Sequence, residues 1–332
     1  MTIAELFERA IRGGISSDPR GREGVLKHLR RERQRFERLS HIEQAEFDAE
    51  RLRHPYADSR VLTGDPEIEV KRALVGIDIH SSEVLLATEL GRQGKPIDLL
   101  IAHHPEGKAL AALDQVMELQ TEVFAAQGVP INVADHLMRP RMAQVARGIS
   151  PENHYQAVDA AALLGFPMVC LHTPADNKAW RYVQLVLDRR APDNVVEVVD
   201  LLKSIPEYKQ AALRGSNVQI VVGSPEARAG RVVALEFTGG TNASKDVYEH
   251  LARAGVGTIV SMHMREEHRE EAEKHHINVV VAPHMASDSL GVNLLLDEFA
   301  QAGLEIIPCS GFIRIERKRR GRRPGQKNGT KT

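Results

Sequence analysis

From about residue 70 onward, short apolar runs alternate with longer segments whose apolar residues recur at helical spacing. The apolar runs have the length of buried strands and are bounded by Gly, Pro or polar residues. Strands are predicted at 73–79, 97–102, 167–171, 218–222, 232–237, 257–261, 277–282 and 304–308. Helices are predicted at 82–92, 139–147, 153–164, 178–213, 244–254, 265–275 and 289–302, with a further helical face at Leu110, Leu113, Met117 and Phe124. This alternation predicts an α/β fold with two α/β halves, each a mostly parallel or mixed sheet flanked by helices.

The segments at the two ends follow different patterns. Apolar residues at helical spacing over 3–12 predict one helix, and a charged segment after Gly21 predicts a second, long helix to about Arg53. We therefore expect an N-terminal helical appendage at 1–66, an α/β region at 67–316 with halves at about 67–215 and 216–316, and a disordered basic tail at 317–332. Within the second half, strands 218–222 and 232–237 are predicted to form a hairpin.

Composition and charge narrow the class of protein. The chain of 332 residues is 42% hydrophobic and 27% charged, as in ordinary globular proteins, and it has no apolar run of the ~20 residues that a membrane helix needs. Residues 317–332 carry eight Lys and Arg and no acid, so the net charge of −1 leaves −9 for residues 1–316. The tail is expected either to aid solubility or to contact a polyanion weakly. Two cysteines in apolar strand-like runs, and an N-terminus without the apolar core of a signal peptide, predict a cytoplasmic location.

Three of the predicted strands end in histidine. The stretch IDLLIAHHPEG at 97–107 ends in an adjacent histidine pair, HTPAD follows the strand at 167–171, and PHMASD follows the strand at 277–282. The carboxyl ends of parallel strands are where α/β folds place their ligands. The polar side chains that these ends supply are His103, His104, His172, Asp176, His284 and Asp288.

Each cluster also has a structural explanation when it is taken alone. Thr173 or Asp176 could cap a helix, and Ser287 or Asp288 could open the helix at 289–302. Taken together, the clusters favour a metal site, since imidazole and carboxylate ligands suit Zn, Mn, Fe or Co. The set exceeds the needs of one tetrahedral ion, so we expect two divalent ions that share a bridging carboxylate.

The order and spacing of four motifs resemble the NIF-three family. The motifs are HHP after a strand, HTPAD, TGG at 238–240 and a late His-x-x-x-acid sequence, and they span roughly residues 70–312. Proteins of that family contain a dinuclear metal centre, are often hexameric and are often labelled GTP cyclohydrolase type 2 homologues. The resemblance therefore implies a toroidal homo-oligomer with two divalent ions per chain. The metal ligands that it implies are His103, His104, Asp176, His284 and Asp288.

Two positions depart from the family pattern. Asp288 stands where the family usually has Glu, and His263 stands in a loop that usually offers a Gly-acid pair. His263 is therefore a candidate for supporting the ligands or transferring a proton, and Glu106, beside the histidine pair, is a candidate general base. The glycine turn at 238–240 could receive an anion or serve as a plain capping turn.

The chemistry expected of such a centre is hydrolysis. Two metal ions about 3.5–4 Å apart can activate a bridging water. This predicts a metal-dependent hydrolase that acts on a small phosphorylated or heterocyclic, nucleotide-like substrate. The alternative is a non-catalytic metal-binding or regulatory protein of the same family, whose oligomer presents surfaces to partners.

Overall fold

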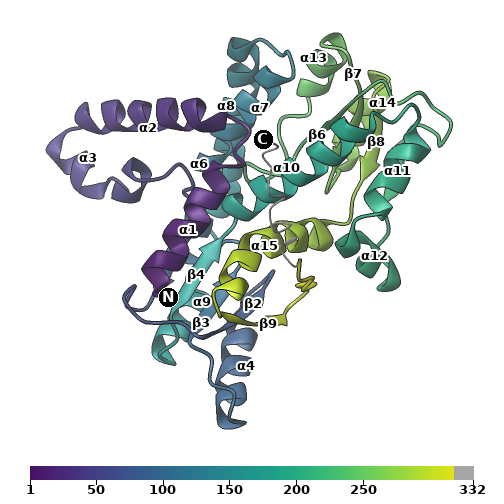
Figure 1. Cartoon of the computed structure of the whole chain (residues 1–332). Coiled ribbons are helices and arrows are strands. Elements are labelled where there is room, and N and C mark those ends of the chain that lie inside the picture. The colour runs from purple at the N-terminus through teal and green to yellow at the C-terminus, as the bar shows by residue number, and fades with distance from the viewer. Residues whose placement is uncertain (318–332) are drawn as a thin grey trace, which may run out of the picture.

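The computed structural model describes residues 1–317, so all but Arg317 of the predicted basic tail lies outside the described residues. The described chain forms two β-sheets with helices on their faces, which confirms the predicted α/β architecture (Figure 1). The first sheet has the strand order β1-β4-β3-β2-β9, and the second has the order β5-β8-β7-β6.

Four strands of the first sheet are parallel, and the edge strand β1 runs antiparallel to β4. Successive side chains of a strand point to opposite faces. Val75 therefore packs against α1, α10 and α15, whereas Leu74 packs against α4 and α9. The strands are β1 (Ser59–Thr63), β2 (Arg72–Gly76), β3 (Leu99–Ala102), β4 (Met168–Leu171) and β9 (Glu305–Cys309). The helices are α1 (Ile3–Ile15), α4 (Ser81–Arg92), α9 (Gln156–Leu163), α10 (Thr173–Arg190) and α15 (His284–Gln301).

The second sheet has three parallel strands and one antiparallel edge strand, β5. Val280 packs towards α11 and α12, and its neighbour Val279 packs towards α7, α8, α13 and α14. The strands are β5 (Gln219–Val222), β6 (Arg231–Ala234), β7 (Val256–Ser261) and β8 (Asn278–Val281). The helices are α7 (Glu118–Ala126), α8 (Ile131–Ile149), α11 (Val195–Lys203), α12 (Pro206–Leu213), α13 (Val247–Arg253) and α14 (Glu266–Lys274).

Two predictions about strand neighbours are wrong. The strands predicted as a hairpin, β5 and β6, lie at opposite edges of the second sheet, because β5 pairs with β8 and β6 pairs with β7. The last strand, β9, was predicted in the second half but pairs in parallel with β2 of the first sheet. The chain therefore returns to the first sheet after it has completed the second.

Helices α10 and α15 pack against each other and join the two sheets. α10 contributes Ala175 to the core of the first sheet and Ala179 to that of the second, and α15 likewise contributes Val292 and Leu290. Gly291 permits the close approach, because a Cβ there would lie 2.3 Å from the carbonyl oxygen of Ala175. The first turns of the two helices, which carry candidate ligands, are thereby held together.

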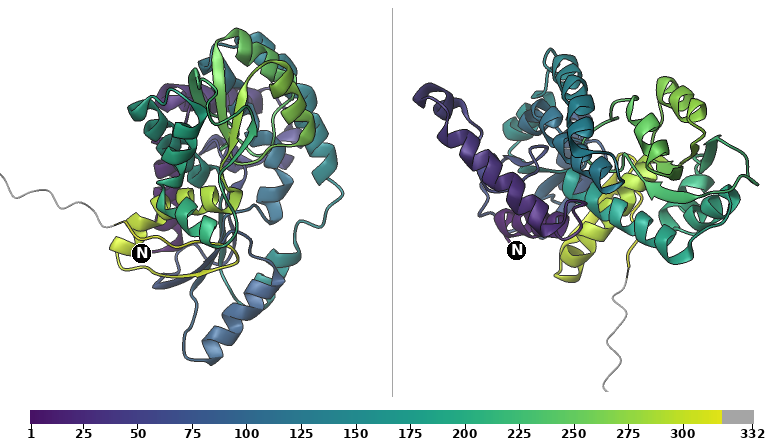
Figure 2. Two further views of the ribbon diagram at one scale, coloured as in Figure 1. Left: turned by 90° about the vertical axis from the view of Figure 1, so that its right-hand side faces the viewer. Right: turned by 90° about the horizontal axis from the view of Figure 1, so that it is seen from above.

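The N-terminal segment is helical, but its long charged helix is shorter than predicted. The helix expected to reach Arg53 is α2 (Gly21–Glu37), and α3 (His41–Glu46) and the 3-10 turn η1 (Ala49–Leu52) follow it. α2 and α3 project from the body of the molecule (Figures 1 and 2), whereas α1 buries Leu6 in the first core. Strand β1 also falls within residues 1–66, where no strand was predicted. The division into domains stays a prediction.

The remaining helices are short. The predicted helical face that includes Met117 is divided among α5 (Gly107–Ala111), α6 (Leu113–Val116) and α7. Within residues 1–317, no helix combines the length and the apolar character needed to cross a membrane.

Candidate metal centre

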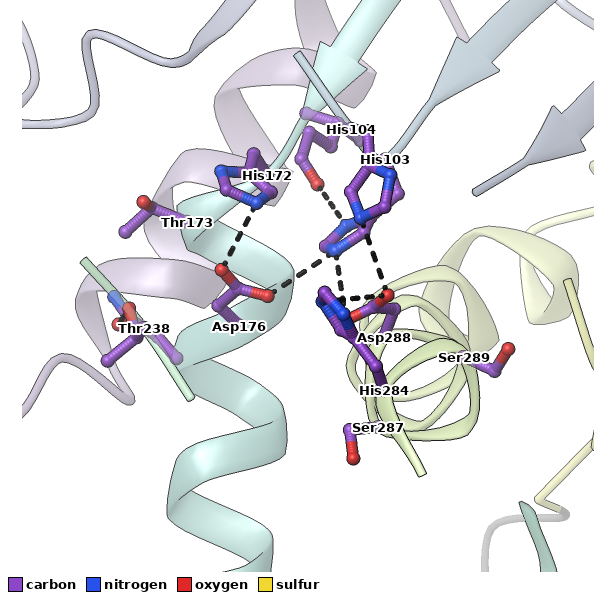
Figure 3. A network of polar contacts seen from close by, with 12 residues as sticks. His103, His104, His172, Thr173, Asp176, Thr238, His284, Ser287, Asp288 and Ser289 are labelled. Carbon is purple, nitrogen blue, oxygen red and sulfur yellow. Dashed lines mark hydrogen bonds and ion pairs between the residues drawn. The ribbon is translucent and has the colours of Figure 1, made fainter. Parts of the chain in front are cut away.

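The three strand ends that the sequence singles out meet at one place (Figure 3). The residues after β3 are tied to the end of β2, because the backbone N–H of His104 donates to the carbonyl oxygen of Ile77 at 2.8 Å. The end of β4 leads into α10, and the end of β8 leads into α15. The side chains that converge from these segments are His103, His104, His172, Asp176, His284 and Asp288.

Inside this cluster, imidazole Nε2 atoms face carboxylate oxygens at nearly equal distances. Nε2 of His103 lies 3.4 Å from Oδ1 of Asp176 and 3.5 Å from Oδ1 of Asp288. The other Nε2–Oδ2 distances are His104–Asp288 at 3.5 Å, His284–Asp288 at 3.6 Å and His172–Asp176 at 3.6 Å. An N–H···O hydrogen bond is about 2.7–3.2 Å long. Two ligands on one tetrahedral ion, at bonds of about 2.1 Å, lie about 3.4 Å apart. The cluster therefore has the spacing of ligands to a shared ion.

Behind the cluster, the other imidazole nitrogens make ordinary hydrogen bonds. The pairs are His104 Nδ1 with Asp78 Oδ1 at 2.7 Å, His172 Nδ1 with Asp58 Oδ2 at 2.7 Å, and His103 Nδ1 with the carbonyl oxygen of Leu171 at 3.2 Å. Ionised carboxylates and carbonyl oxygens can only accept, so each Nδ1 carries a proton and donates it. Nε2 is then the atom left to bind inside the cluster.

In the described part of the chain, the two carboxylates of the cluster are buried with no Lys or Arg paired to them. Asp176 and Asp288 are each 1% exposed, and among residues 1–317 their ion-pair partners are histidines rather than Lys or Arg. Three of their oxygens, and Nε2 of His103, have no hydrogen-bond partner in this part of the chain. Because a buried carboxylate needs a counter-charge, protons on the imidazoles or a metal ion must supply it.

The pKa values show how strongly the cluster attracts positive charge. Burial lowers the pKa of His103, but the carboxylates of Asp288 and Asp176 more than offset this and raise it to about 10. Burial likewise lowers the pKa of His104, while Asp288 and Asp78 raise it to about 9. Burial raises the pKa of Asp288, yet the neighbouring imidazoles hold it well below its usual range.

The donor set fits a divalent metal ion. Two groups of ligand atoms each lie within 4.8 Å of one another, namely His103, His104 and Asp288, and His103, His172 and Asp176. Mixed imidazole and carboxylate ligands suit Zn, Mn, Fe or Co. The orphaned buried atoms and their spacing both agree with a bound cation, so these groups could hold one.

A known structure shares this fold. The structure is similar to that of a NIF3 superfamily protein from Sphaerobacter thermophilus, with a TM-score of 0.70 and 28% sequence identity over 79% of this chain and 94% of that chain. The chain is NIF3-like. Reduced HcgD from Methanocaldococcus jannaschii is also similar, with a TM-score of 0.47 and 16% identity over 75% of this chain and 87% of that chain. A Bacillus cereus protein related to NIF3 has a TM-score of 0.41 and 10% identity over 75% of this chain and 90% of that chain. No protein-family model matches the sequence, and no curated protein matches it.

In this NIF3-like chain, two of the three sequence motifs, HTPAD and PHMASD, lie at helix starts. α10 begins at Thr173, directly after His172, so the capping and ligand explanations of HTPAD are compatible. α15 begins at His284 instead of residue 289, which makes the prediction that Ser287 or Asp288 opens this helix wrong. Residues four apart share a helix face, so the earlier start points His284 and Asp288 to the same side.

The cluster is closed on one side and exposed on the other. The side chain of His103 is 1% exposed, whereas those of His104 and His284 are 28% and 37% exposed. His263, which follows β7, places its ring 5.3 Å from that of His284, centroid to centroid. The exposed side of the cluster is therefore lined by three histidines from both halves of the chain.

Two other features that the sequence suggested, Glu106 as a general base and the glycine turn at 238–240 as an anion site, make contacts outside the cluster. Glu106 pairs with Nδ1 of the exposed His80 at 3.0 Å rather than with the candidate ligand histidines. In the glycine turn, the carbonyl oxygens of Gly239 and Thr241 each accept a hydrogen bond from Nε2 of Gln120 at 2.6 Å. These contacts favour a structural role for the turn, and α13 begins only several residues later.

Three residues of the site are absent from the ligand set that the family resemblance implies. His172 lies in the HTPAD motif, so its signal is present, but the resemblance assigns only Asp176 there. Asp78 lies just beyond the end of β2, and its position at a strand end is a signal that sequence reasoning could have used. Asp58 precedes β1, a strand that was not predicted, so no comparable signal marks it.

Proposed function

We propose that this chain binds two divalent metal ions in the histidine–aspartate cluster and is a metal-dependent hydrolase of a small phosphorylated or nucleotide-like compound. The proposal rests on the contrast between Nε2–carboxylate distances of 3.4–3.6 Å inside the cluster and Nδ1–carboxylate distances of 2.7 Å behind it. Histidines whose Nδ1 is held by a hydrogen bond and whose Nε2 has no hydrogen-bond partner are typical of metal centres. Bound divalent ions supply Lewis acidity that stabilises negative charge on a substrate oxygen.

The arrangement of the carboxylates supports two ions instead of one. One ion would be held by His103, His172 and Asp176, and the other by His104, His284 and Asp288. Oδ1 of Asp288 faces His103, while its Oδ2 faces His104 and His284. A carboxylate whose two oxygens face different imidazoles is suited to bridge neighbouring ions. Asp288 can therefore serve the role that the family gives to a glutamate.

His263 is our candidate for moving a proton at the exposed side. Nδ2 of Asn242 donates to Oε2 of Glu236 at 3.0 Å, and a carboxylate can only accept, so this atom is the amide nitrogen. The same Nδ2 lies 2.8 Å from Nδ1 of His263, which must then accept and leave the proton on Nε2. With its proton on Nε2, His263 would donate a hydrogen bond to a substrate oxygen, which its position beside His284 supports. Proton transfer through this ring would require Asn242 to release Nδ1, so that Nδ1 can itself take up a proton. Glu106 is the second candidate for proton transfer.

Metal analysis tests the binding half of the proposal. Protein purified from cultures supplemented with Mn, Fe or Zn is expected to carry about two ions per chain, as a dinuclear centre requires. Asp288→Asn removes the shared carboxylate and should lower this number. Fewer than one ion per wild-type chain would contradict the proposal.

An activity screen tests the catalytic half. Metal-loaded protein is assayed on nucleotides, phosphate esters and cyclic amides, beside His104→Ala and a control, His41→Ala, which removes an exposed histidine of α3. We expect turnover that is lost in His104→Ala, retained in His41→Ala and reduced in His263→Ala. Circular dichroism confirms that each variant is folded. Turnover that survives His104→Ala would exclude this cluster as the active site.

The second candidate function is non-catalytic metal binding or regulation. The depth of the ligands favours it, since His103, Asp176 and Asp288 are each 1% exposed and leave little room for a substrate. Metal binding without turnover across the whole substrate panel would support this function instead.

The hexameric assembly that the family implies and a cytoplasmic location also remain proposals. Light scattering of the purified chain tests the assembly.

A further inference from the structure

A polar cavity whose lining includes none of the candidate metal ligands lies between α8, the loop before α13 and the start of α14. Its volume is about 560 Å³, within the range of small-molecule pockets. Arg141, Gln144 and Arg147 line it from one face of α8, and Lys245 lines it from the loop. The positions follow helical spacing, so one face of α8 presents two guanidinium groups to the same space.

Among the residues that the structure describes, no carboxylate forms an ion pair with the cationic side chains of this cavity. Within residues 1–317, Arg141, Arg147 and Lys245 form no ion pair of 4.0 Å or less, whereas Arg139 on the same helix pairs with Asp135 at 2.7 Å. An exposed cation without a partner is common, but three around one cavity create a local excess of positive potential.

Two carboxylates among the lining residues reduce this excess of positive charge but do not cancel it. Asp246 and Glu267 line the cavity, but the side chain of Glu267 is 53% exposed and lies closest to His268, at 3.9 Å. Burial and the nearby Arg265 lower the pKa of Arg141, against a smaller opposite effect of Glu267. The lining residues thus carry three positive charges against two negative ones, so one positive charge stays uncompensated.

The cavity is also prepared for a ligand. Nε of Arg141 donates to the carbonyl oxygen of Asn242 at 2.9 Å, and its Nη1 donates to Oε1 of Gln144 at 2.8 Å. A guanidinium already held in place loses little side-chain entropy on binding. His268, 2% exposed, donates through Nε2 to the carbonyl oxygen of Ala243 at 3.1 Å, and its Nδ1 has no hydrogen-bond partner among the described residues.

We propose that this cavity binds the phosphate group of a small phosphorylated metabolite through Arg141, Arg147 and Lys245. Phosphate fits because its oxygens accept the paired N–H donors of arginine and its charge matches the local excess. The cavity is larger than a phosphate group, which leaves space for the organic part of the ligand. The proposal does not depend on the metal centre or on hydrolysis.

Isothermal titration calorimetry tests this site with pyrophosphate and a nucleoside diphosphate as probes. Both the full-length metal-free protein and the metal-loaded protein are titrated, so that phosphate bound to metal is recognised. Arg147→Gln and Lys245→Gln remove exposed cations and should leave the fold intact. Arg139→Gln makes the same change on the other side of α8 and serves as the matched control.

We expect saturable binding to the metal-free protein that weakens about tenfold in Arg147→Gln and in Lys245→Gln and stays within about twofold in Arg139→Gln. Equal affinity for both probes would assign the site to the phosphate group, and tighter binding of the nucleoside diphosphate would extend it to the organic part. Either result supports the proposal. It is overturned if neither probe binds at millimolar concentration, if binding requires the metals, or if the three variants behave alike.

Discussion

At the scale of single residues, the two nitrogens of an imidazole in the cluster differ in their partners, and this difference defines the site. Nδ1 makes a short hydrogen bond to a supporting oxygen, whereas Nε2 lies farther from the carboxylates of the cluster. His172 illustrates it, with Nδ1 2.7 Å from Asp58 and Nε2 3.6 Å from Asp176. Asp58 also accepts a hydrogen bond from Oγ1 of Thr173 at 2.6 Å, so this carboxylate fixes both the imidazole and the start of α10. A residue that touches no ion is thus expected to determine how well one binds.

Asp58→Asn should weaken metal binding without removing a ligand. The amide keeps the size of the side chain but is a poorer acceptor for the Nδ1 proton of His172. We expect a loss of about 10–100-fold in metal affinity, the usual effect of such supporting residues, measured by competition with a chromogenic chelator. Asp65→Asn, an exposed change in the loop after β1, is the control. Equal affinities of Asp58→Asn and wild type would argue against an oriented His172 ligand.

Metal binding should release protons and should strengthen as the pH rises. In the metal-free chain, His103 and His104 have pKa values raised to about 10 and about 9, so at neutral pH they hold protons that a metal must displace. Lower pH favours the protonated imidazoles, and affinity should therefore fall from pH 8 to pH 6. Calorimetry in buffers of different ionisation enthalpy counts the protons. No proton release and a flat pH profile would contradict the assignment of these ligands.

At the scale of elements, sequence patterns located the strands and helices but did not predict which strands pair with each other in the sheets. The strand at 304–308 was recognised, yet its pairing with β2 depends on a partner more than 200 residues away that local periodicity does not encode. The same holds for β5, which pairs with β8 instead of the nearer β6. Local pattern therefore predicts which segments are strands, whereas the contacts that order them are long-range.

The contact between α10 and α15 gives a prediction at this scale. In Gly291→Ala the added Cβ would clash with the carbonyl oxygen of Ala175, next to Asp176, so the helices must separate. We expect a loss of about 1–3 kcal/mol in the free energy of unfolding, measured by urea denaturation, together with weaker metal binding. Gly148→Ala in α8 is the matched control, because its Cβ would meet no atom within 4 Å. If both variants were equally stable, the proposed close approach would be wrong.

At the scale of the whole molecule, the candidate metal ligands come from segments that are far apart in the sequence and meet where the two halves join. His103 follows a strand of the first sheet, and His284 follows a strand of the second. Histidines at strand ends were visible in the sequence, because parallel strands gather their carboxyl ends at one edge. The supporting carboxylate of Asp58 was not, because its position depends on the antiparallel edge strand β1.

Anomalous scattering from crystals of the Mn- or Zn-loaded protein tests the central claim most directly. We predict two anomalous peaks per chain inside the cluster, about 3.5–4 Å apart, with Asp288 between them and His172 among the ligands. Peaks at other positions, or none among these six side chains at full metal loading, would contradict the account.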